Sequence, residues 1–92
     1  MEYQIWLNGE YFPRSEAKIS MLDRGFRLGD VVFDTSRTFN GKIFRTRDHL
    51  NRLYRSLQYV RIDPGMSIDE MEELTEEVVS RNEPAREAGD DY

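Results

Sequence analysis

Residues 45–62, which read RTRDHLNRLYRSLQYVRI, limit the possible folds more than any other segment of this chain. Their large apolar side chains recur at the i, i+3, i+4, i+7 spacing of a single helix face. This spacing predicts an amphipathic helix over about residues 47–60, with Thr46 or Asp48 as its N-cap. The apolar face is made of Leu50, Leu53, Tyr54, Leu57 and Val60.

A second helix is predicted to begin at Ser67. Glu70 follows three residues later, and this pair has the pattern of a capping box. The glutamates at positions 72, 73, 76 and 77 are expected on the solvated face of this helix. Its apolar stripe is made of Ile68, Met71, Leu74 or Thr75, and Val78.

Two Asn-Gly pairs predict β-hairpins, because both residues of such a tight turn readily take positive φ. The stronger of the two hairpins joins residues 31–39, which are rich in aromatic and β-branched side chains, to residues 42–46. Between the hairpins, two glycines four residues apart indicate turns rather than a helix interior. The turn pairs are Asn8-Gly9 and Asn40-Gly41, and the separate glycines are Gly25 and Gly29.

The order of these elements predicts the fold class. Strands come first and two helices follow, which favours an α+β domain. We therefore expect a small antiparallel sheet with two helices packed on one side. The 92 residues are enough for one small domain with a thin core.

Composition excludes several classes of protein. With no cysteine, the chain has neither disulfides nor a thiolate metal site, and we expect no metal site of another kind. No apolar run approaches the roughly 20 residues of a membrane span, and the N-terminus lacks the basic region of a signal peptide. A cytoplasmic location, without membrane contact, is therefore the default expectation.

The charge is unevenly distributed along the chain. Residues 1–62 hold 11 Lys and Arg against 7 Asp and Glu, whereas residues 63–92 hold 2 against 11. The basic part could attract phosphates, or the two segments could simply lie on different solvated faces. Both interpretations stay open at this point.

The residues alone support little conventional catalysis. With one histidine, no cysteine and no phosphate-binding glycine loop, the remaining chemistry is recognition of an anion by an arginine. Arg52 could hold a phosphate through its planar fork of donors, although a solvent-exposed arginine is the simpler alternative. A second alternative is a nucleic-acid- or protein-binding module that uses residues 47–61, which put basic and aromatic side chains on one helix.

Four blocks in the same order give the chain a recognisable family pattern. They are NGE near the start, DRGFRLGDVVFD, FNGKIF and HLNRLYRS, and they extend over about 60 residues. Together they resemble the N-terminal part of the class IV aminotransferases, the fold-type IV enzymes that use pyridoxal 5'-phosphate. That family includes branched-chain aminotransferases, D-amino-acid aminotransferases and aminodeoxychorismate lyases.

The resemblance implies roles for single residues. Arg52, in the family's HLxRL segment, would bind the phosphate of pyridoxal 5'-phosphate. His49, in the same segment, would be a structural hydrogen-bond partner at the helix start. Phe33 and Arg37 would share one face of a strand and line the substrate pocket, with Asp34 pointing to the opposite side. Leu28 would also line the pocket, at a position where several relatives carry a tyrosine.

The resemblance also implies a division into domains. Residues 1–82 would be the small N-terminal domain, and residues 83–92 a linker or the start of a further strand. The family's Schiff-base lysine and the acidic partner of the pyridine nitrogen belong to a large C-terminal domain that is absent from this chain. We therefore expect no catalytic residue here, and no activity or cofactor binding by the 92 residues alone.

The function implied for the longer protein is transfer of amino groups between amino acids and 2-oxo acids, in the manner of the branched-chain enzymes. An aminodeoxychorismate lyase is the alternative within the family. The expected assembly is a homodimer whose active sites are touched by both subunits, with no nucleic acid as partner.

Overall fold

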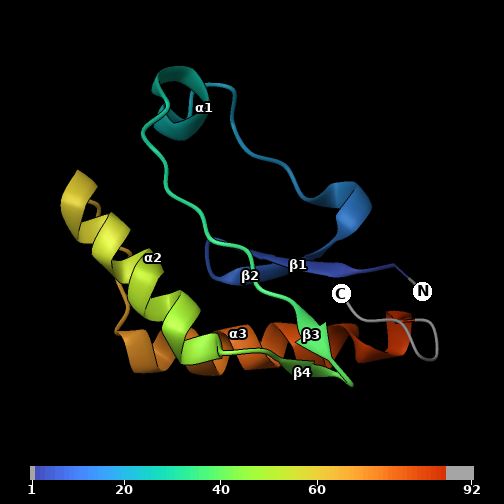
Figure 1. Cartoon of the computed structure of the whole chain (residues 1–92). Helices are drawn as coiled ribbons and strands as arrows, with labels where there is room; N and C mark the ends of the chain where they lie inside the picture. Colours follow the sequence, from blue (N-terminus) through green and yellow to red (C-terminus); the bar gives the residue numbers. More distant parts are fainter. Residues whose placement is uncertain (1, 87–92) are drawn as a thin grey trace.

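The computed structural model describes residues 2–86, and the chain folds as an α+β unit in that range (Figure 1). The α+β prediction is confirmed, but the strands form two separate two-stranded sheets among the described residues instead of one. The elements, in chain order, are β1 (Gln4–Leu7), β2 (Glu10–Pro13), η1 (Arg14–Glu16), α1 (Arg24–Leu28), β3 (Thr38–Phe39), β4 (Lys42–Ile43), α2 (Thr46–Val60), α3 (Ile68–Asn82) and η2 (Glu83–Ala85). In this part of the chain, no helix has the length and apolar content that crossing a membrane requires.

The first hairpin forms as predicted. β1 and β2 pair antiparallel, with Leu7 opposite Glu10 at the turn end. Asn8 and Gly9 have φ values of 51° and 91°, as a two-residue turn with both residues in the left-handed region requires. The Asn-Gly signal therefore identified this turn correctly.

The second hairpin is much shorter than predicted. Its Asn-Gly turn is in place, but only Thr38 and Phe39 pair, with Ile43 and Lys42 respectively. Residues 31–37 form no strand and run as an irregular segment between α1 and β3 (Figure 1). The prediction of a strand over 31–39 is wrong, because strand propensity produces a strand only where a neighbouring strand supplies backbone partners. No described strand pairs with that segment, although the Arg37 carbonyl accepts from the Phe44 backbone N–H at 2.8 Å just before β3.

The glycine-rich segment also differs from its prediction. Gly25 lies inside the short helix α1, whose N-cap is Asp23, with Oδ2 accepting from the Gly25 backbone N–H at 2.8 Å. Gly29 does act as a breaker, since it ends α1 in the left-handed conformation with φ of 69°. The capping aspartate outweighs the helix penalty of one glycine, and this pairing was missed.

Helix α2 begins within one residue of its predicted start, but its cap is different. The N-cap is Arg45, in the left-handed region with φ of 54° and no side-chain capping bond. Neither Thr46 nor Asp48 is the N-cap, so that prediction is wrong. The tight turn from β4 forces the chain into α2 at Arg45, which leaves Thr46 already helical.

Helix α3 has the predicted capping box. The Ser67 side chain accepts from the Glu70 backbone N–H at 3.1 Å, and the Glu70 carboxylate accepts from the Ser67 backbone N–H at 3.0 Å. Two of the orphan N–H groups at the helix start are therefore satisfied locally.

The core lies where α3 packs against both α2 and β1. Leu50 and Leu57 of α2 are only 7% and 8% exposed, in agreement with the predicted apolar face, whereas Val60 at its end is exposed. Asn82, 6% exposed at the end of α3, joins the helix to the first hairpin. Its Oδ1 accepts from the Gln4 backbone N–H at 2.6 Å, and its Nδ2 donates to the Gln4 carbonyl at 2.9 Å.

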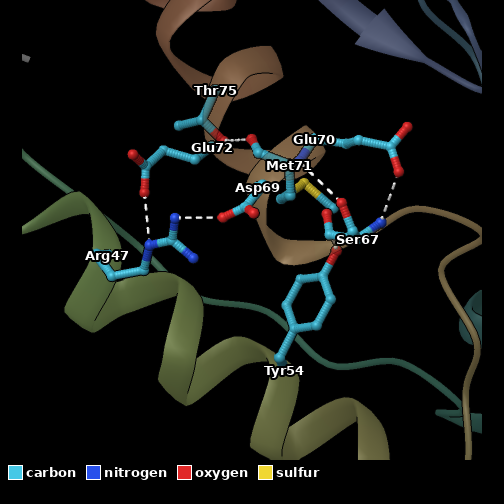
Figure 2. A network of polar contacts seen from close by, with 8 residues as sticks. All are labelled: Arg47, Tyr54, Ser67, Asp69, Glu70, Met71, Glu72 and Thr75. Carbon is cyan, nitrogen blue, oxygen red and sulfur yellow. Dashed lines mark hydrogen bonds and ion pairs between the residues drawn. The ribbon is translucent and has the colours of Figure 1, made fainter.

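Polar contacts also hold α2 to α3 (Figure 2). Arg47 forms ion pairs with Asp69 at 2.6 Å and Glu72 at 2.7 Å. The Tyr54 hydroxyl donates to the Met66 carbonyl at 2.8 Å. Glu72 is half-buried in this contact, so the prediction that it lies on the solvated face is wrong.

The segment from η1 to β3 leaves many large apolar side chains uncovered. It rises away from the rest of the fold, with α1 at its tip (Figure 1). Its exposed apolar residues are Ile19, Met21, Leu22, Phe26, Leu28, Val31 and Phe33. The prediction that a further strand begins near Tyr92 falls outside the described residues.

Candidate functional site

The candidate site is centred on Arg52, on the second turn of α2. Its guanidinium is held side-on by the Asp34 carboxylate, with Nε donating to Oδ2 at 2.6 Å and Nη2 donating to Oδ1 at 2.8 Å. This is the bidentate pairing that the planar fork of arginine favours. Asp34 therefore faces α2. Residues 31–37 are not a strand, so the alternation that was expected to turn Asp34 away from Phe33 and Arg37 does not apply, and that orientation stays a prediction.

His49 is the third member of this cluster. Its Nδ1 lies 2.8 Å from Asp34 Oδ1 and 3.0 Å from Arg52 Nη2. One ring nitrogen cannot donate to the carboxylate and accept from the guanidinium at once. We assign the proton to Nδ1, donating to Asp34, because a lone pair facing an ionised carboxylate would be repelled. His49 is thus a hydrogen-bond partner in the first turn of α2, and the group it contacts is the Asp34 side chain from another segment.

The electrostatics of the cluster follow from these contacts. The hydrogen bonds from Arg52 hold the pKa of Asp34 well below its usual range, against the opposing effect of burial and with help from His49. The same contact raises the pKa of Arg52 above its ordinary value. At neutral pH, Asp34 and Arg52 are therefore an ionised pair.

Asp34 and Arg52 differ in how much of each side chain is exposed to solvent. The Asp34 side chain is only 9% exposed, whereas the Arg52 side chain is 59% exposed. Nη1 of Arg52 has no hydrogen-bond or ion-pair partner among residues 2–86, so its two N–H groups are available to an incoming anion. Arg52 also lines an open, mainly apolar hollow together with Arg55 and Ser56. The open edge of the Arg52 guanidinium suits a phosphate ester.

The residues predicted to line a substrate pocket lie at the end of α1 and along the irregular segment that follows it. Leu28 ends α1 and is 69% exposed, and Phe33 is 85% exposed. The Arg37 guanidinium lies over the Phe39 ring, 5.0 Å from its centre. The argument that Phe33 and Arg37 share a strand face does not apply to this irregular segment, so their role in a pocket stays a prediction.

Two residues of the nucleic-acid alternative are already engaged within the fold. Arg47 pairs with two carboxylates of α3, and the Tyr54 hydroxyl donates to backbone carbonyls between the helices (Figure 2). Neither is directed outward to a ligand.

Two features of the structure were not predicted from the sequence. Asn82 lies four residues after Val78, so it continues the apolar stripe of α3, and that spacing could have identified it as buried. The structure also holds a mainly apolar groove of about 510 Å³ between the two hairpins and α3, lined by Tyr3, Trp6, Arg37, Ile43, Leu74 and Val78 among others. No local sequence signal predicts a groove whose walls come from four separate segments.

A comparison with known families identifies this chain. Residues 31–89 match the model described as amino-transferase class IV, and these residues include Asp34, His49 and Arg52. The chain belongs to the class IV aminotransferase family, as its sequence blocks suggested.

Several named proteins are similar to the chain over most of its length. The D-alanine aminotransferase of Staphylococcus aureus (strain N315) is 39% identical over 80 residues, which are 87% of this chain and 28% of that protein. The D-alanine aminotransferase of Staphylococcus haemolyticus is 32% identical over 79 residues, 86% of this chain and 28% of that protein. The "Putative branched-chain-amino-acid aminotransferase" of Methanocaldococcus jannaschii is 34% identical over 79 residues, 86% of this chain and 27% of that protein. The chain thus covers little more than a quarter of the length of these relatives.

Proposed function

We propose that this chain is the small N-terminal domain of a pyridoxal 5'-phosphate-dependent aminotransferase, and that Arg52 binds the phosphate of the cofactor. One observation carries this proposal. Arg52 lies within the family match, is fixed side-on by a largely covered carboxylate, and keeps Nη1 open toward solvent.

Arg52 and two of its neighbours on α2 would contribute differently to phosphate binding. Arg52 offers a permanent positive charge and a planar pair of donors, which suits a doubly ionised phosphate ester. Arg55 and Ser56, beside the same hollow, are placed to add weaker contacts. The cofactor, when bound, supplies the electron sink that amino transfer needs. The groups that do covalent chemistry with it belong, in this proposal, to the part of the protein that follows the small domain of residues 1–82.

The substrates are amino acids and 2-oxo acids. The names of the relatives point to two donors, D-alanine and the branched-chain amino acids, and both enter the proposal as candidates. Leu28 and Phe33 would form apolar parts of the substrate pocket, with Arg37 as a basic group near it. The resemblance further supports a homodimer that acts in the cytoplasm.

An assay of donors on the full-length enzyme tests this function. The enzyme, supplied with pyridoxal 5'-phosphate and a 2-oxo acid, is given D-alanine, L-alanine, L-leucine or L-valine in separate reactions. Chromatography then measures the new amino acid and the new 2-oxo acid. We expect the two products in equal amounts from at least one donor. If no donor is converted and aminodeoxychorismate is consumed instead, the enzyme is a lyase and the proposal is wrong.

A further inference from the structure

We infer that Asp34 is a positioning residue, which holds the guanidinium of Arg52 in the orientation that receives the cofactor phosphate. The inference rests on the proposed function and extends it to a residue outside the helix that carries Arg52. Asp34 itself touches no phosphate in this arrangement and acts through Arg52 alone.

The way in which Asp34 holds Arg52 supports this role. A carboxylate that binds Nε and Nη2 occupies the side edge of the guanidinium and fixes the plane of the group. The end edge, with Nη1, stays open. Because the Arg52 side chain is 59% exposed, little else restrains its rotamers. Without Asp34, the guanidinium would sample many orientations, and phosphate binding would have to order it.

The Asp34 carboxylate is itself held in place. The Asp34 side chain is 9% exposed, and His49 hydrogen-bonds the same oxygen, Oδ1, that accepts from Arg52 Nη2. His49 and Arg52 lie three residues apart on α2 and therefore share a helix face. The Asp34 carboxylate thus joins the irregular segment 31–37 to two positions on one face of α2.

A carboxylate beside a phosphate-binding arginine could have the opposite effect. It cancels the positive charge, so it could compete with the phosphate and weaken binding. The geometry argues against competition, because Asp34 occupies the side edge and the phosphate can use the end edge without displacing it. The two roles predict opposite signs for removal of the Asp34 charge.

The test measures cofactor affinity of the full-length enzyme, freed of cofactor, by titration with pyridoxal 5'-phosphate and, separately, with pyridoxal. Asp34→Asn keeps the shape of the side chain and removes its charge. We expect it to weaken binding of pyridoxal 5'-phosphate about tenfold, the lower end of what partners that orient a binding group contribute, and to leave pyridoxal affinity unchanged. Asp34→Glu should recover most of the loss, because it restores a carboxylate.

A double-mutant cycle separates positioning from a merely structural effect. If Asp34 acts through Arg52, Asp34→Asn should cause no further loss in an Arg52→Ala background. Asp69→Asn is the matched control, since Asp69 holds Arg47 on the same helix by an ion pair of similar length, and it should leave both affinities unchanged. Circular dichroism spectra establish that each variant is folded.

The outcomes distinguish this inference from the function on which it rests. If Arg52→Ala weakens binding but Asp34→Asn leaves it unchanged or tightens it, the positioning role is wrong and the function stands. Equal additional loss in the Arg52→Ala background also overturns the positioning role. If the wild-type enzyme does not bind pyridoxal 5'-phosphate, both proposals fail.

Discussion

Asn82 offers a direct test of how the first hairpin is held on α3. Its side-chain amide lies against β1 much as a neighbouring strand would, donating to the Gln4 carbonyl and accepting from the Gln4 N–H. It also donates to the Val78 carbonyl at 2.9 Å. The residue is 6% exposed, so water competes poorly for these groups. Asn82→Ala removes all three hydrogen bonds at once.

The size of the effect follows from these contacts. Each hydrogen bond contributes a net value of about 0.5–1.5 kcal/mol. Only the two bonds to Gln4 are broken when β1 opens, because the bond to Val78 lies within α3, so the loss for opening is about 1–3 kcal/mol. At about 1.4 kcal/mol per factor of ten, local opening of β1 should become roughly 5 to 150 times more frequent.

Hydrogen exchange measured by mass spectrometry gives the readout, on the peptide that begins at residue 2 and covers β1. The amides of β1 should lose protection by that factor in Asn82→Ala, while peptides from the middle of α2 keep theirs. Ser80→Ala, an exposed position on the same helix, is the control and should resemble the wild type. Unchanged protection of β1 in Asn82→Ala would refute the claim that this amide holds the hairpin.

Three further predictions follow from the ion pairs and from the family assignment. Arg47→Ala should lower the thermal unfolding temperature slightly, because it breaks two partly exposed ion pairs between α2 and α3. The loss should shrink at high salt, and a loss independent of salt would contradict an electrostatic cause. The pKa of Asp34 is lower in the folded than in the unfolded state, so its pairing stabilises the fold at neutral pH and ceases to do so as acid protonates it. Urea titrations should therefore show Asp34→Asn to be less stable than wild type at neutral pH and the difference to shrink below about pH 4, near the unfolded pKa; a constant difference would rule this out. The 92-residue chain alone should convert no amino donor and show no absorbance of protein-bound cofactor, and a yellow protein would disprove this.

Local signals predicted those parts of the fold whose stabilising contacts are also local. The capping box of α3 joins residues three apart, and the first Asn-Gly turn needs only the φ preferences of its own two residues. The apolar face of α2 was likewise visible, because a helix repeats its own pattern. In these cases the interacting groups are neighbours in the sequence.

The errors arose where contacts come from distant segments. Residues 31–37 have the composition of a strand, yet no neighbouring strand in residues 2–86 pairs with them. Because that strand does not form, strand alternation cannot be used to place Asp34. The cap of α2 was misplaced for a related reason, because the geometry of the preceding turn determined the first helical residue.

In the candidate site, too, what could be predicted from the sequence differs from what required the structure. Arg52 was selected from a family pattern, and the structure places it on α2 beside a hollow. Its partner, 18 residues earlier, could not be found by periodicity, since nothing in the sequence relates an irregular segment to a helix face. The identity of the family needed only blocks in the right order, whereas the geometry of the site needed coordinates.

The central claim is that Arg52, and not simply any arginine at the start of α2, binds the phosphate of the cofactor. Equilibrium dialysis of the full-length enzyme against pyridoxal 5'-phosphate tests it, with Arg52→Ala compared with Arg47→Ala. Arg52→Ala should weaken binding strongly, and Arg47→Ala should stay close to the wild type, because Arg47 is already paired with two carboxylates. Equal losses in the two variants would exclude Arg52 as the specific phosphate ligand.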